Sequence, residues 1–90
     1  MPSDSDLRCR VCGLQQSSPP WGEDGRSPTF DICDCCGVEF GYEDSTVAGV
    51  SEFRAAWLRK GAPWFRPEAR PPGWSPESQL KQVPDPFNRG

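Results

Sequence analysis

The chain has 90 residues, of which 34% are hydrophobic, and a formal net charge of −3 at pH 7. This length limits it to one domain, and so small a core usually needs a metal ion or disulfide bonds to hold it together. No apolar run is long enough to cross a membrane and the acidic start excludes a secretion signal, so we expect a cytoplasmic protein with reduced thiols.

The N-terminal half contains two Cys-x-x-Cys-Gly units. Residues 1–6 are polar, and we expect them to be a disordered tail. A metal-binding ribbon is then predicted over 7–45, because Cys9–Gly13 and Cys33–Gly37 have the pairing and separation of one tetrahedral, all-sulfur site. A glycine after the second cysteine of each unit allows the positive φ that closes the turn. The predicted metal ligands are Cys9, Cys12, Cys33 and Cys36.

The fifth cysteine, Cys35, does not fit this ligand set. When the two units are aligned, Cys35 corresponds to Val11, which cannot bind a metal. We expect Cys35 to lie near the site without ligating, because no neighbouring His or Lys in the sequence would activate its thiol. A reactive or exchanging thiol is the alternative.

The ligand set favours one Zn²⁺ per chain, with a single iron, as in rubredoxins, as the alternative. Four cysteines leave no open coordination position, which is typical of a structural site. The chain contains no His, the commonest general base, so we expect a protein that is not an enzyme.

A β-hairpin is predicted around the second cysteine pair. Residues 17–28 are dense in turn formers and should form a loop, whereas 29–32 and 38–42 alternate between apolar and polar residues. Two such runs on either side of Cys33–Gly37 predict a hairpin whose turn carries the second pair. This is the core of a zinc-ribbon-like architecture.

The second half predicts a helical and aromatic extension over 46–83. Apolar residues recur at helical spacing in a predicted helix over 46–60, whose Arg54, Arg59 and Lys60 we expect on a solvated face. A proline-rich aromatic stretch follows, and a short helix is predicted from Ser75 to about Val83. Residues 84–90 should fray. The fold class is therefore small α+β, with one domain over 7–83.

The charge distribution separates the candidate functions. Residues 1–45 carry nine acidic and three basic residues, and residues 46–90 carry four acidic and seven basic ones. An acidic metal-binding half argues against a nucleic-acid-binding zinc ribbon, which remains the second alternative after an iron electron carrier. The leading hypothesis is a non-enzymatic module that binds a protein partner, with no nucleic acid and no membrane. The candidate partner contacts are Trp64, Phe65 and Trp74.

Several motifs resemble those of small, uncharacterised bacterial proteins that are similar to the cysteine-rich CPCC proteins. The resemblance covers about residues 7–83 and implies a zinc-ribbon-like site at the same four cysteines, with no known activity. Where that family has a proline after the first cysteine of a pair, this chain has Arg10 and Asp34, which removes no ligand. The motifs that carry it are Cys9–Gly13, Pro19–Gly25, Ile32–Asp44, Trp57–Phe65 and Gly73-Trp74.

Overall fold

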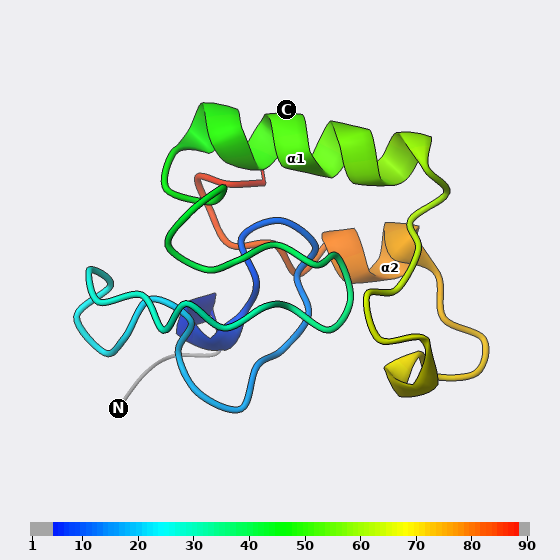
Figure 1. Ribbon diagram of the computed structural model, residues 1–90, viewed down its shortest axis with the longest axis horizontal. Coiled ribbons are helices and arrows are strands. Elements are labelled where there is room, and N and C mark those ends of the chain that lie inside the picture. The colour runs from blue at the N-terminus through cyan, green and yellow to red at the C-terminus, as the bar shows by residue number, and fades with distance from the viewer. Residues whose placement is uncertain (1–4, 89–90) are drawn as a thin grey trace.

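The computed structural model describes residues 5–88, and its regular elements are two α-helices and two 3-10 helices (Figure 1). The 3-10 helix η1 spans Ser5–Leu7, and η2 spans Pro67–Ala69. The helix α1 runs over Val47–Arg59 along one side of the molecule, with the cysteine-bearing loops beside it (Figure 1). The short helix α2 spans Pro76–Leu80.

Both α-helices begin at capped N-termini. The Oγ1 atom of Thr46 accepts a hydrogen bond from the Gly49 N–H at 2.9 Å, and Ser75 accepts one from the Ser78 N–H at 3.3 Å. The predicted helix over 46–60 corresponds to α1. The second helix is shorter than expected, because Val83 precedes a proline and therefore disfavours the helical conformation.

Each cysteine pair lies in a small loop that an isolated antiparallel bridge closes. Arg8 pairs with Gln15 around the first loop, and Ile32 pairs with Glu39 around the second. No longer strand is present in the described part of the chain, so the predicted hairpin is reduced to one bridge. Phe30 and Gly41, with φ of 63° and 101°, interrupt the extended backbone on the two sides of it.

The interior consists of the cysteine loops packed against α1 and three tryptophans. Trp74 lies between Trp57 and Trp64, with ring centroids 6.3 Å and 5.3 Å away, and the second pair is edge-to-face. Val38 and Phe40 are buried in this core, as expected for the apolar face of the predicted 38–42 strand. The aromatic side chains on the far side of the bridge, Phe30 and Tyr42, are instead 61% and 73% exposed.

Both ends of the chain were predicted to be tails. Residues 1–4 of the predicted disordered tail and residues 89–90 of the predicted frayed end lie outside the described range. Ser5 and Asp6 belong to η1, and Phe87 packs against the core, where its ring lies 4.4 Å from the Arg10 guanidinium. Within residues 5–88 no helix combines the length and the apolar character that crossing a membrane requires.

Candidate metal centre

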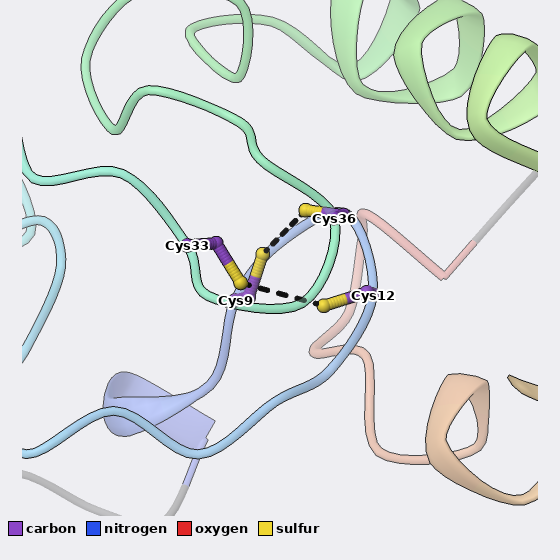
Figure 2. Close-up of side chains that lie close together, drawn as sticks. All are labelled: Cys9, Cys12, Cys33 and Cys36. Atoms are coloured by element: carbon purple, nitrogen blue, oxygen red, sulfur yellow. Dashed lines mark hydrogen bonds between the residues drawn. The ribbon is translucent and has the colours of Figure 1, made fainter. Parts of the chain in front are cut away.

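The structure brings the four predicted ligands together. Their sulfur atoms all lie within 4.8 Å of one another, and the Cys9–Cys36 and Cys12–Cys33 sulfurs are each 3.7 Å apart (Figure 2). Metal–sulfur bonds of about 2.3 Å in a tetrahedron place the sulfurs about 3.8 Å apart, whereas a disulfide needs about 2.05 Å. All four are free thiols in the structure. Their spacing therefore fits a metal ion that binds four sulfurs.

The two loops position their sulfurs in the same way. In each, the glycine N–H donates to the carbonyl of the first cysteine at 3.0 Å, from Gly13 to Cys9 and from Gly37 to Cys33. The glycines have φ of 86° and 81°, as the sequence predicts. The structure adds a steric reason, since a Cβ would lie 2.5 Å from the Gln79 carbonyl oxygen at position 13. At position 37 it would lie 3.2 Å from the Phe65 ring.

Burial governs the protonation of the thiols. Removal from water raises the pKa of Cys12 and of Cys36, because the charged thiolate is disfavoured there. The pKa of Cys33 is lowered, first of all by a hydrogen bond from the Cys12 thiol. Without a cation, burial therefore disfavours the thiolate forms of Cys12 and Cys36. A divalent ion would displace the remaining protons, which makes metal affinity depend on pH.

Arg54 is the main residue of this site that the sequence interpretation misplaced. Its side chain is only 7% exposed, although we expected it on a solvated face. It donates to the carbonyls of Val11 at 2.7 Å, Arg10 at 2.9 Å and Phe87 at 2.6 Å. Burial lowers its pKa, and the negative charges of the cysteine cluster oppose that shift. The guanidinium thus holds the first cysteine loop and partly balances the thiolates.

A second arginine fixes the first loop from its outer side. The Arg10 guanidinium lies between two aromatic rings, 4.0 Å from the centroid of Trp21 and 4.4 Å from that of Phe87. It also donates to the Asp44 carbonyl oxygen at 3.0 Å. The Asp44 side chain is fully buried and accepts a hydrogen bond from the Trp21 indole at 2.9 Å. Arg10 thus connects this loop to two distant segments.

Gln79 connects α2 to the cysteine loops, a role that the sequence did not indicate. Its side-chain amide donates to the Cys12 carbonyl at 3.2 Å and to the Cys35 sulfur at 3.3 Å. Its oxygen accepts from the Trp74 indole at 2.9 Å. A single glutamine on a short helix carries no sequence pattern that indicates a contact with a distant loop. The sequence did indicate burial of Arg54, because it lies four residues after Val50 and three before Trp57, on the apolar face of the helix.

Cys35 is fully buried and is not part of the four-sulfur cluster. We expect Cys35→Ser to retain the bound metal and the fold, because a hydroxyl can accept the hydrogen bond from Gln79. Cys36→Ser, the matched change at the next residue, should lose the metal, since it removes one of four sulfurs. Metal content and thermal melting of both variants measure this. Loss of metal from the Cys35 variant would show that the ligand set is wrong.

The three candidate contact residues are buried to different degrees. Trp64 is only 8% exposed and Trp74 is partly buried, and both pack in the tryptophan cluster. Their packing leaves less of these two side chains for a partner to contact. Phe65 is 56% exposed and is the one of the three that a partner could reach freely.

Comparison with known proteins gives two relatives from Bacillus subtilis strain 168, both described as uncharacterised. The chain is 38% identical to YoaQ over 81 residues, which covers 74% of this chain and 67% of YoaQ. It is 33% identical to YozI over 79 residues, which covers 70% of this chain and 65% of YozI. The chain thus spans about two thirds of the length of these relatives.

No family model matches the sequence, and no solved structure matches the fold. The extent and identity of the match to YoaQ place the chain in one family with it, and both relatives are described as uncharacterised. The chain therefore belongs to the family of uncharacterised proteins that includes YoaQ and YozI, and in this member four cysteines form a candidate metal site.

Proposed function

We propose that this protein is a zinc-stabilised, non-enzymatic module of the zinc-ribbon type, related to the CPCC proteins, that binds a protein partner in the cytoplasm. The observation that carries the proposal is the four-sulfur cluster, with its 3.7 Å sulfur separations. Four sulfurs suit zinc, and they leave it no open position for a substrate or water. The metal would then stabilise the fold and take no part in a reaction.

The partner surface in this proposal centres on Phe65. Its ring is exposed, yet its backbone is fixed, because its N–H donates to the Cys35 carbonyl at 2.9 Å. The next residue pairs in the same way, from the Arg66 N–H to the Asp34 carbonyl at 2.9 Å. An aromatic side chain on a rigid segment loses little entropy on binding, as interface anchors generally do. The metal centre supports this segment through the second cysteine loop.

Elemental analysis of protein purified without chelators tests the metal assignment. We expect one zinc per chain and a colourless protein, with cobalt substitution giving the absorption of a tetrahedral thiolate site. Cys36→Ser is the control that should lose the metal. A red protein with one iron per chain would replace the zinc assignment by the electron-carrier alternative. A metal-free protein, or disulfides among the four cysteines, would refute the proposal.

The charge distribution predicts no useful affinity for duplex DNA. Residues 1–45 have a net charge of −6 from nine acidic and three basic residues, and four thiolates on a divalent ion add negative charge. Titration of a labelled duplex at near-physiological salt should show no saturable binding below roughly 10⁻⁴ M, the weak end of non-specific binding. Tight binding that falls steeply with salt would instead favour a nucleic-acid-binding ribbon.

A further inference from the structure

The four cysteines of the metal centre are not equally buried. Cys9, Cys12 and Cys33 have no exposed surface, whereas the residue Cys36 retains 7% exposure. Gln79 lies on the first loop and the Arg54 guanidinium on its backbone carbonyls. Cys36 is therefore the predicted ligand residue that is not fully enclosed.

The same cysteine lines a cavity of about 180 Å³ between α1 and the segment that follows it. The helix contributes Phe53 and Ala56, and the segment that begins at its C-cap contributes Lys60, Trp64 and Phe65. Typical pockets for drug-sized ligands are about 300–1,000 Å³, so this cavity suits a molecule of only a few heavy atoms. The cavity also borders Cys36, one of the predicted metal ligands.

The charge at the cavity indicates the chemistry of the occupant. Lys60 is the one charged side chain among the described residues that line the cavity, which favours a ligand with an anionic group.

We propose that this cavity is the access route to the metal, where a small anionic thiol reaches Cys36 and takes its place as a ligand. This inference rests on the proposed zinc site. In the step, the metal–sulfur bond of Cys36 breaks and a bond to the incoming sulfur forms. The proton of the incoming thiol passes to the Cys36 sulfur. Zinc stays divalent and no electrons are transferred, so the step needs no oxidant or reductant.

The test follows zinc transfer from the loaded full-length protein to a chromophoric chelator at rising concentrations of thioglycolate. The transfer rate should rise in proportion to thioglycolate. Ala56→Leu fills the cavity and should lower the thiol-dependent rate on the order of tenfold, because a packed cavity leaves no room for the ligand. Ala55→Leu is the matched control, since Ala55 is exposed on the same helix and does not line the cavity. It should leave the rate unchanged.

A charge reversal gives an independent readout if Ala56→Leu fails to fold. Lys60→Glu, at an exposed position, should shift the preference between anionic thioglycolate and cationic cysteamine about fivefold towards cysteamine, as one nearby surface charge does. A transfer rate that does not depend on thiol concentration would mean that zinc leaves by unfolding and would overturn the proposal. Equal rates for Ala55→Leu and Ala56→Leu, or an unchanged preference in Lys60→Glu, would also overturn it.

Failure of the proposed zinc site would be detected when the protein is loaded with zinc, before the transfer rate is measured. A chain that takes up no zinc during loading would refute the proposed function before any transfer rate is measured. A chain that holds one zinc but releases it independently of thiol would refute only the access route. The two results are therefore distinguishable in the same experiment.

Discussion

Removal of the metal is expected to unfold the protein, with loss of the near-ultraviolet circular dichroism of its tryptophans. Four of the twelve residues in the buried cluster are the predicted metal ligands, so these cysteines are a large part of the core. Structural zinc contributes about 10–16 kcal/mol in small modules, whereas whole domains are stable by about 5–15 kcal/mol. The remaining apolar side chains should not hold the fold when that contribution is lost.

Trp57, Trp64 and Trp74 report this transition, because their packing requires α1, the segment that follows it and the segment before α2 at once. The spectrum should collapse in excess chelator and return when zinc is added in excess of the chelator. The exposed Phe30 and Ile32 would be poor probes. An unchanged spectrum in protein shown to be free of metal would mean that the core is stable alone.

Arg54→Ala is expected to reduce the free energy of unfolding by about 3–5 kcal/mol, the usual loss when one partner of a buried charged network is removed. Three backbone carbonyls would lose their donor, and the thiolate cluster would lose a nearby positive charge. Arg54→Lys should restore only part of the loss, because a single ammonium cannot reproduce the planar geometry of the guanidinium.

Arg59→Ala is the matched control, since Arg59 is exposed in the last turn of the same helix. Its effect should stay within about 0.5 kcal/mol, as for most surface positions. Urea denaturation of the zinc-loaded variants gives the three values. An Arg54→Ala variant as stable as the control would show that the buried hydrogen bonds contribute little.

The cysteine spacing identified the residues that cluster, because one ion constrains four side chains in a way that leaves a local pattern in the sequence. Roles that depend on distant backbone left a weaker trace. Arg54 was misplaced since charged residues on a helix usually face water, and only its position between Val50 and Trp57 argued otherwise. Gln79 acts on a loop 67 residues away, and no local rule indicates such a contact.

The alternation in 29–42 predicted strands that the structure reduces to a single bridge. Apolar alternation records which side chains could share a face, but it does not exclude a residue with positive φ within the run. Phe30 has a φ of 63°, and bulky aromatic residues rarely adopt a positive φ. The sequence therefore did not indicate it. The assignment to the zinc-ribbon architecture therefore remains a proposal.

The order of the covering residues along the chain has a consequence for biosynthesis. All four cluster thiols precede Phe65 and Gln79 in the sequence, and Gln79 follows Cys35 by 44 residues. At about 5–20 residues per second, a ribosome needs roughly 2–9 s to add that stretch. All four cluster thiols are therefore synthesised before the segments that will enclose them.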